Sequence, residues 1–563
     1  EKYYPSLSVT GCQCRRSARI RGEAGEDLEG DWCIQLGEFA ESCIKTNRAR
    51  RVTKEEAYEL LRKAEEMGFV HEVTNIDGPK KSLFICNCNP ETCLAFRTAR
   101  LVDTPNMMKS NFVASVDKEK CVACGQCMEV CPMNAAKLGQ KLCQENPVKI
   151  KKSITPDDHV WGKDKWTLDY RTNKKNVIPE TGTSPCKTNC PAHISVQGYL
   201  KLANQGRYSE ALELIKKENP FPAVCGRICN HRCEDACTRG NVDNPVAIDE
   251  VKKFIANQEL DSGSRFVPKK KYSDGKKIAV IGGGPAGLTC AYYLAVYGHH
   301  VTVFEKMDQP GGMLKYGLPS FRLEKDVVDA EIEVLKDLGV EFKTGVEVGK
   351  DITLNKLRTQ GYKGFYLAIG AQGGRKAGIE GEDAKGVLTG IDFLRDINMG
   401  KTQNLSGRTV VVGGGNVAID VARTAVRAGS SQVSMYCLES RDIMPAADDE
   451  IEEAEAENIT INNSWGPKRI VVEDGKLKGI EFKKCVRVFD EENRFSPLYD
   501  ENDTVIVECE NVLMTIGQSI EWKNLLDGSK VELNRNQTAK ANGFTYQTAE
   551  PDIFVGGDMF SGP

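Results

Sequence analysis

The sequence predicts a multidomain protein in which cysteine-rich, helical modules precede two Rossmann-like α/β domains, one nested within the other. Three observations lead to this fold class. The chain has 563 residues, enough for several domains of ordinary size. Eighteen of its 22 cysteines lie before residue 240. Two glycine-rich turns, each preceded by a run of apolar β-formers, begin at Gly282 and Gly413.

Composition and charge exclude several functional classes. A net charge of −4 gives no general attraction to nucleic acid or to a membrane surface. The apolar run 278–298 is interrupted by glycines, so it favours strand–turn–helix over a membrane span, which needs about 20 apolar residues. Abundant cysteine without a visible signal peptide favours metal ligands over disulfides. We therefore expect a cytoplasmic protein from an organism with low oxygen exposure.

The most specific motif is the compact run of Cys121, Cys124, Cys127 and Cys131, the last followed by proline. This C-x2-C-x2-C-x3-C-P spacing is typical of bacterial ferredoxins and predicts a [4Fe–4S] cluster. Structural zinc sites usually combine two separated C-x2-C pairs instead. In two-cluster ferredoxins the fourth cysteine of the run binds the other cluster.

Cysteines upstream of the run could hold that other cluster. Cys86, Cys88 and Cys93 would take Cys131 as their fourth ligand, and Cys143 would then complete the compact run. A zinc site or plain buried thiols are the alternatives. Four more cysteines form a possible further quartet of no recognised spacing: Cys12, Cys14, Cys33 and Cys43.

Two segments around these motifs have simpler interpretations. The capping box formed by Thr53 and Glu56 predicts a helix that ends at Gly68 and serves as scaffold. Polar, lysine-rich residues 145–180 show no periodicity and predict a linker.

A helical module follows the linker. It begins with the C-x3-C-P motif of Cys186 and Cys190, and apolar periodicity predicts helices over 196–202 and 208–217. Three C-x3-C steps come next. Gly226 favours a loose coil, which can wrap around a cluster, rather than one continuous helix. The four cysteines of these steps are Cys225, Cys229, Cys233 and Cys237.

The first glycine-rich turn is a complete dinucleotide-binding signature. A buried strand, 277–281, runs into Gly282, Gly284 and Gly287 in G-x-G-x-x-G spacing, and a helix follows. Glu305 ends the next strand, where an acid accepts hydrogen bonds from ribose hydroxyls. The glycines let the backbone approach a pyrophosphate at the helix N-terminus.

The second turn has G-x-G-x-x-A spacing from Gly413 to Ala418. It follows an apolar strand and precedes a predicted helix, 417–426, and a predicted strand, 432–437. Two such units in one chain predict two bound dinucleotides.

From residue 184 onward the chain resembles the small subunit of glutamate synthase and the related electron-input half of dihydropyrimidine dehydrogenase. The resemblance is carried by the C-x3-C-P motif, the phrase Pro222–Cys229 and the flavin domain. It implies two [4Fe–4S] clusters in the helical module, which need eight ligands. Two family cysteines are missing from 176–185, so a second cluster would need a ligand such as His193 or His231, or be absent.

The resemblance implies FAD at the first turn, extended by the segments 311–323, 368–370 and 554–558. The expected FAD residues are Gly282, Gly284, Pro285, Ala286, Gly287, Glu305, Lys306, Gly312, Leu314, Arg322, Val348, Ala368, Gly370, Gly557 and Asp558.

The resemblance also implies a nicotinamide nucleotide at the second turn. NADPH-using relatives carry an arginine pair where this chain has Leu438 and Glu439, counted back from Met444. An acid at this strand end favours a free 2′-hydroxyl and repels a 2′-phosphate, which predicts NAD(H), although Arg441 leaves NADP(H) open. The expected residues are Gly413, Gly414, Gly415, Asn416, Val417, Ala418, Glu439 and Arg441.

The remaining cysteines, Cys290, Cys437, Cys485 and Cys509, show no spacing of a redox disulfide, and we expect buried small hydrophobes. Electrons leaving the flavin would then pass to the clusters. No protein side chain is expected to be catalytic, because hydride transfer takes place at the FAD.

These observations predict an NAD(H)-dependent FAD and iron–sulfur electron-transfer subunit with two to four [4Fe–4S] clusters. A partner oxidoreductase or ferredoxin would complete a hetero-oligomer. An NADPH-dependent glutamate synthase small subunit and a non-catalytic redox-sensing or assembly protein are the alternatives. The predicted parts are an iron–sulfur extension (1–150), a linker (151–183), a helical [4Fe–4S] domain (184–270), an FAD domain (277–375 and 505–563) and an NAD(H) domain (376–504).

Overall fold

The computed structural model describes residues 5–20, 31–67, 69–73, 82–89, 92–101, 116–117, 120–122, 124–125, 127, 184–263, 265–271, 275–401 and 404–563. Gly68, Cys131, Cys143 and the expected linker lie outside these residues. The chain divides into two compact units. The first contains the described parts of Glu1–Asn219, Asn230–Gln258 and Lys271–Asp274, and the second those of Pro220–Cys229, Glu259–Lys270 and Gly275–Pro563.

The N-terminal domain of the first unit is an antiparallel sheet with helices. Its strand order is β3-β1-β2-β5-β4. The Thr53 hydroxyl accepts a hydrogen bond from the Glu56 amide, as the capping box predicts, and begins α3. The elements are β1 (Leu7–Gly11), α1 (Gln13–Ile20), β2 (Asp31–Leu36), α2 (Gly37–Lys45), β3 (Arg50–Arg51), α3 (Lys54–Glu66), β4 (Val70–Val73), β5 (Phe84–Cys88) and α4 (Leu94–Leu101).

The helical part of the first unit contains the two helices that periodicity predicts, over 196–202 and 208–217. They pack on each other through buried side chains such as Tyr199, Leu202 and Ile215. The elements are α6 (Pro185–Asn189), α7 (Val196–Asn204), α8 (Tyr208–Lys216), α10 (Arg232–Asp235), the 3₁₀ helix η3 (Thr238–Asn241) and α11 (Ile248–Ser262).

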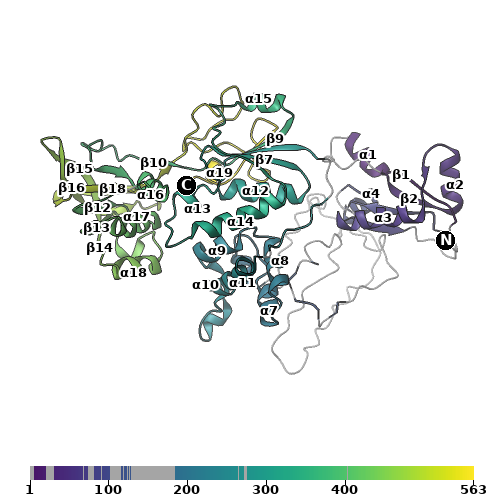
Figure 1. Ribbon diagram of the computed structural model, residues 1–563, viewed down its shortest axis with the longest axis horizontal. Helices are drawn as coiled ribbons and strands as arrows, with labels where there is room; N and C mark the ends of the chain where they lie inside the picture. The colour runs from purple at the N-terminus through teal and green to yellow at the C-terminus, as the bar shows by residue number, and fades with distance from the viewer. Residues whose placement is uncertain are drawn as a thin grey trace, which may run out of the picture. The chain divides into compact units, whose positions relative to one another are not determined.

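The first dinucleotide domain, in the second unit, is a parallel sheet of order β20-β9-β6-β7-β8. Figure 1 shows α12 and α14 on one side of this sheet, where their apolar faces form one core with the strands. The elements are β6 (Lys277–Ile281), α12 (Pro285–Val296), β7 (His300–Phe304), α13 (Met313–Tyr316), α14 (Lys325–Asp337), β8 (Glu341–Lys343), α15 (Leu354–Thr359), β9 (Tyr362–Leu367), β20 (Ile553–Val555) and α19 (Asp558–Ser561).

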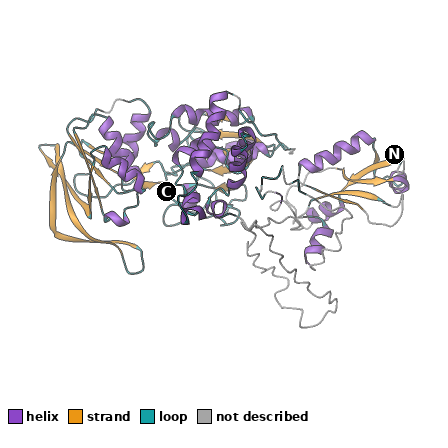
Figure 2. Cartoon of the chain, turned by 90° about the horizontal axis from the view of Figure 1, so that it is seen from below, coloured by secondary structure: helices purple, strands orange, loops and turns teal. Residues whose placement is uncertain are grey.

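The second dinucleotide domain is inserted into the first and has the parallel order β11-β18-β12-β13-β14. Figure 2 shows the long antiparallel strands β15–β17 that belong to it. The elements are β11 (Val387–Thr389), α16 (Gly390–Asn398), β12 (Arg408–Val412), α17 (Asn416–Arg427), β13 (Gln432–Cys437), the 3₁₀ helix η4 (Arg441–Ile443), α18 (Asp448–Ala456), β14 (Thr460–Asn463), β15 (Trp465–Glu473), β16 (Lys476–Phe489), β17 (Phe495–Glu508) and β18 (Asn511–Met514).

Two further features of the chain concern the connections between the domains. The short strands β10 (Gly373–Gly374) and β19 (Gln518–Ser519) pair where the chain leaves and re-enters the first domain. The chain returns to the first domain after β18, because β18 lies between β11 and β12 in the second sheet. Helix α9 (Pro222–Ile228), expected within the helical domain, belongs to the second unit.

Candidate cofactor sites

The first glycine-rich turn brings backbone atoms closer than any side chain would allow. Gly282 has a φ of +106°, and a Cβ there would lie 2.3 Å from the Ala368 carbonyl oxygen. A Cβ on Gly287 would lie 2.0 Å from the Gly282 carbonyl oxygen, so this glycine sets the packing of α12 against the turn. Pro285 opens α12 and leaves the helix N-terminus facing the turn, as a pyrophosphate requires.

Glu305 is fixed beside this turn. Its carboxylate accepts hydrogen bonds from the Gly283 amide at 2.7 Å and the Met307 amide at 2.8 Å. The residue is 3% exposed, and burial raises the pKa of its carboxyl against the opposing effect of those amides. The acid is thus held at the strand end where a ribose would lie.

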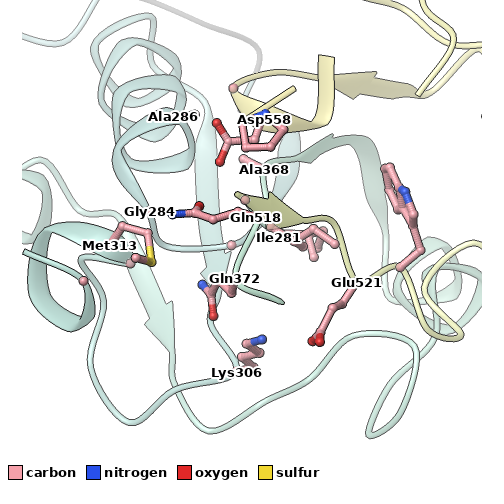
Figure 3. A pocket seen from close by; sticks show the side chains of 18 of the residues that line it. Ile281, Gly284, Ala286, Lys306, Met313, Ala368, Gln372, Gln518, Glu521 and Asp558 are labelled. Atoms are coloured by element: carbon pink, nitrogen blue, oxygen red, sulfur yellow. The ribbon is translucent and has the colours of Figure 1, made fainter. Parts of the chain in front are cut away.

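A cavity of about 1050 Å³ opens from this turn. Figure 3 shows Asp558 and Ala368 at one end, with Lys306, Gln372 and Glu521 around the other. A groove of this volume, with a glycine cradle, a helix N-terminus and a buried acid, fits a dinucleotide. The expected FAD residues that line it are Gly282, Gly284, Pro285, Ala286, Glu305, Lys306, Gly312, Val348, Ala368, Gly370, Gly557 and Asp558.

Three expected FAD residues do not line this cavity. Gly287 packs the helix against the turn, and Leu314 is buried in the core beneath it. Arg322 instead forms ion pairs with Asp420 and Glu450 of the second domain.

Sequence reasoning missed several polar residues of the cavity wall. They come from the segments next to β10 and β19, where the two domains join. No spacing rule relates segments so far apart in the sequence, although Gln372 follows the predicted segment 368–370 directly. The residues are Gln372, Arg375, Gln518, Glu521 and Lys523.

The second turn repeats the close approach of the first. Gly413 has a φ of +141°, and a Cβ there would lie 2.3 Å from Thr515 Oγ1. Asn416 begins α17, and its side-chain carbonyl accepts a hydrogen bond from the Ala447 amide at 2.9 Å. Asn416 therefore fixes the loop before α18, and Ala418 is buried under the turn. Val417 is the expected nucleotide residue that also lines the 1050 Å³ cavity.

The Glu439 carboxylate lies at the second turn much as Glu305 lies at the first. A Cβ on Gly414 would lie 2.9 Å from Glu439 Oε2, and one on Gly283 would lie 3.1 Å from Glu305 Oε2. The two acids do not occupy equivalent strand positions. The Gly282 amide donates to the carbonyl of Phe304, the residue before Glu305, and the Gly413 amide donates to the carbonyl of Tyr436, the residue before Cys437. Cys437 is therefore the equivalent of Glu305, and Glu439 lies two residues further along the chain. Arg441 pairs with Glu455 at 3.4 Å.

Part of the compact cysteine run lies against α7. The Ser195 hydroxyl donates to the Cys124 carbonyl at 2.9 Å, and the Lys201 ammonium donates to that of Cys121 at 2.6 Å. Cys127 is exposed. Cys131 and Cys143, which should complete the ligand sets, lie outside the described residues.

The cysteines of the helical module lie on short, interrupted helices, as a cluster-wrapping coil requires. His231, at φ +52°, interrupts the helical conformation between α9 and α10, and its ring lies 3.4 Å from the Asp249 carboxylate. In the first unit Cys186 and Cys190 lie on or beside α6, which packs on α10 with Cys233. Amides, chiefly that of Val246, lower the pKa of the Cys237 thiol, as suits a thiolate ligand.

Cys225 and Cys229 lie on and just after α9, in the second unit. The Glu331 carboxylate of α14 accepts hydrogen bonds from the Ala223 and Val224 amides at 2.8 and 3.0 Å. Arg227 pairs with Glu324 at 2.6 Å. Both contacts attach the cysteine-bearing helix to the first dinucleotide domain.

The upstream cysteines group differently from the expected sets. Cys12 is hydrogen bonded to Cys33, and Cys33 Sγ lies 3.9 Å from Cys86 Sγ, so members of the two expected sets meet. Cys43 lies apart on α2. The spacing-based sets fail to anticipate this because β2 and β5 are paired across more than 50 residues.

The four cysteines of the dinucleotide half occupy separate elements, and burial raises the pKa of each thiol. It reaches about 12 for Cys290 and Cys509 and about 11 for Cys437. The pKa of the Cys485 thiol is also raised by burial. Such thiols have little nucleophilic or redox character.

Comparison with known proteins identifies the fold. Residues 240–358 and 276–563 match the pyridine nucleotide-disulphide oxidoreductase family, residues 180–264 the 4Fe–4S domain II of dihydropyrimidine dehydrogenase, and residues 114–137 the 4Fe–4S binding domain. The chain is 34% identical to the glutamate synthase [NADPH] small chain of Escherichia coli over 405 residues, covering 68% of this chain and 84% of that one. The chain belongs to the pyridine nucleotide-disulphide oxidoreductase family. The glutamate synthase small chain is one of its relatives.

Other members of this oxidoreductase family are subunits of larger enzymes by name. The chain is 37% identical to the beta subunit of NADP(+)-dependent formate dehydrogenase from Moorella thermoacetica over 68% of its own length. It is 35% identical to the beta subunit of NADPH-Fe(3+) oxidoreductase from Geobacter sulfurreducens over 63%. It spans 57% and 54% of these relatives, slightly more than half their length.

The family assignment confirms the expected fold class and cofactor types. The chain is an oxidoreductase that binds FAD, a nicotinamide nucleotide and [4Fe–4S] clusters. Among the described residues, helices are all too short or too polar to cross a membrane.

Proposed function

We propose that this chain is an NAD(H)-linked electron-transfer subunit that exchanges electrons with a partner oxidoreductase subunit or a ferredoxin. Bound FAD exchanges a hydride with the nicotinamide and single electrons with the clusters. The relatives' names, which describe beta subunits and a small chain, support a hetero-oligomer.

The position of the Glu439 carboxylate carries the NAD(H) assignment. It lies against Gly414 as Glu305 lies against Gly283, although it arrives from a different strand position. At this place a carboxylate can accept hydrogen bonds from both ribose hydroxyls, and it repels a 2′-phosphate. Arg441, the residue that could favour the phosphate, is paired with Glu455.

The thiols of the dinucleotide half support the clusters as the electron outlet. Burial raises the pKa of each thiol, so none has the activated thiolate that disulfide exchange needs. Helix α9 brings Cys225 into the second unit, where Glu331 attaches it to the first dinucleotide domain. Cys225 and Cys229 are thus carried by a helix that is attached to that domain.

Nucleotide preference tests the proposal directly. In an anaerobic dye-reduction assay we expect a higher kcat/KM with NADH than with NADPH, and Glu439→Arg should move the ratio toward NADPH by about tenfold or more. Glu473→Arg makes the same charge change on β15 and should leave the ratio unchanged. Equal or better use of NADPH by the unaltered chain would contradict the assignment.

One observation favours a second candidate, an NADPH-dependent subunit that serves glutamate synthesis. It is the 34% identity to the glutamate synthase [NADPH] small chain over most of that protein. The assay above separates the two candidates, because this second function requires NADPH to be the better reductant. Purification of the native complex then identifies the partner.

A further inference from the structure

Six cysteines of the N-terminal domain meet although they come from different segments of the chain. Cys33 and Cys86 are direct partners across β2 and β5, with their sulfurs 3.9 Å apart. The sulfurs of Cys88 and Cys93 lie 3.4 Å apart. We call this group the cysteine nest: Cys12, Cys14, Cys33, Cys86, Cys88 and Cys93.

Sheet register explains how the nest forms. Cys86 stands opposite Cys33 on one side and opposite Glu72 of β4 on the other, and residues directly opposite share a face. Cys88 lies two residues further along β5 and therefore on that face too. Cys93 precedes α4, whose Phe96 packs against Cys88 and closes the group.

Glu72 joins two of these sulfurs. Its Oε2 lies 3.3 Å from Cys88 Sγ and 4.0 Å from Cys93 Sγ, and the three ligand atoms all lie within 4.8 Å of one another. Around one tetrahedral ion with metal–sulfur bonds of about 2.3 Å, neighbouring sulfurs stand about 3.8 Å apart. The observed separations are close to the edges of one such tetrahedron.

This geometry fits zinc better than a [4Fe–4S] cluster. Each iron of a cubane takes one protein thiolate, so its ligand sulfurs belong to different irons and lie further apart than one tetrahedral edge. A carboxylate is an ordinary ligand of zinc, whereas cubanes are held by thiolates. The separations in the nest instead suit several donors on a single ion.

We propose that Glu72, Cys86, Cys88 and Cys93 hold a structural zinc ion. Glu72, Cys88 and Cys93 already lie within 4.8 Å of one another, and we infer Cys86 as the fourth ligand because it stands opposite Glu72, two residues before Cys88 on the same face of β5. Binding replaces the thiol protons by the metal, which takes up three thiolates and a carboxylate. The ion joins β4, β5 and the start of α4, and leaves Cys131 to the compact run. This site is independent of the proposed electron-transfer function.

Metal analysis of the full-length chain tests the site. The protein is purified anaerobically, reconstituted with iron and sulfide, and passed through chelator-treated buffer before zinc, iron and sulfide are counted. We expect about one zinc per chain. The double variant Cys88→Ser, Cys93→Ser should lose the zinc and keep its iron, sulfide and FAD, while Cys43→Ser, outside the nest on α2, should keep all of them.

Glu72→Gln provides a test that leaves every thiol in place. It should weaken zinc retention against a chelator by about tenfold or more, whereas Glu65→Gln, at an exposed position of α3, should not. Replacing zinc by Co²⁺ should give the thiolate charge-transfer bands of a tetrahedral site, and these should vanish in the double variant. A chain without zinc, or loss of iron and sulfide at constant zinc in the double variant, would overturn the proposal.

Discussion

The Arg322 guanidinium connects the two dinucleotide domains through buried carboxylates. It lies 2.9 Å from Asp420 and 2.6 Å from Glu450, whose side chains are 4% and 12% exposed. Burial raises the pKa of the Asp420 carboxyl in spite of the arginine, so the pair depends on that positive charge. The family resemblance implied a position for Arg322 at the flavin, and no local sequence pattern predicts ion-pair partners about a hundred residues away.

Arg322→Met should therefore destabilise the second unit. Two buried carboxylates would lose their counter-charge, at a cost of about 3 kcal/mol. Urea unfolding followed by flavin fluorescence measures the change. Arg494→Met, which breaks an exposed pair with Asp490, should cost less than about 1 kcal/mol. Similar losses in the two variants would contradict the role given to Arg322.

Lys325 gives the stability a predictable dependence on pH. Its ammonium donates to the Leu314 and Leu318 carbonyls, and burial, helped by Lys315, lowers its pKa to about 8 from 10.5. Between these values the unfolded chain binds more protons than the folded one, so this group makes stability rise with pH. As the pH falls from 10.5 to about 8, this contribution to the stability is lost.

Lys325→Met should remove that part of the pH dependence. Because buried thiols and tyrosines with raised pKa values give the opposite slope, the informative quantity is the difference between the variant and the unaltered chain. Unfolding free energies measured from pH 7.5 to 10.5 should show the unaltered chain gaining on the variant as pH rises. A constant difference would mean that Lys325 titrates at its ordinary pKa.

Regular elements with strong periodicity were predictable, and those made by long-range pairing were not. The helices α7, α8 and α17 and the strand β13 lie within a few residues of their expected bounds, because one apolar face repeats along each. The N-terminal strands have no such signal, since their residues are fixed by partners 12 to 53 positions away. The glycine turns were likewise predictable, whereas the Gln518–Lys523 wall was not.

At the scale of elements, the Glu331 carboxylate of α14 holds the N-terminus of α9. Each Glu331 oxygen accepts from one amide at the start of α9, and a glutamine at this place could accept only one of those bonds. Glu331→Gln should leave a buried amide unpaired, which costs about 1–3 kcal/mol locally. Hydrogen exchange should quicken across α9 and stay unchanged in α7. Equal protection of α9 in both proteins would show that other contacts hold this helix.

At the scale of the whole molecule, cofactor sites and proposed cluster ligands occupy different parts of the chain. Both glycine turns and their acids lie after residue 276, while every cysteine assigned to a cluster lies before residue 240. The nested arrangement of the two parallel sheets brings the segments around residues 372 and 518 together at one cavity. Hydride exchange needs only this half of the chain.

Loss of the clusters should consequently separate two activities. In a Cys190→Ser, Cys229→Ser variant we expect NADH to bleach the flavin at nearly the normal rate in stopped flow, because the nucleotide and flavin sites are untouched. Reduction of the native acceptor or of ferredoxin should collapse, since the thiols of the dinucleotide half, whose pKa values are raised by burial, offer no other outlet. Cys290→Ala, which removes a thiol of α12 unrelated to the clusters, should retain both activities. Full acceptor reduction without Cys190 and Cys229 would mean that electrons leave directly from the flavin, and the serial route from nicotinamide through FAD to the clusters would then be wrong.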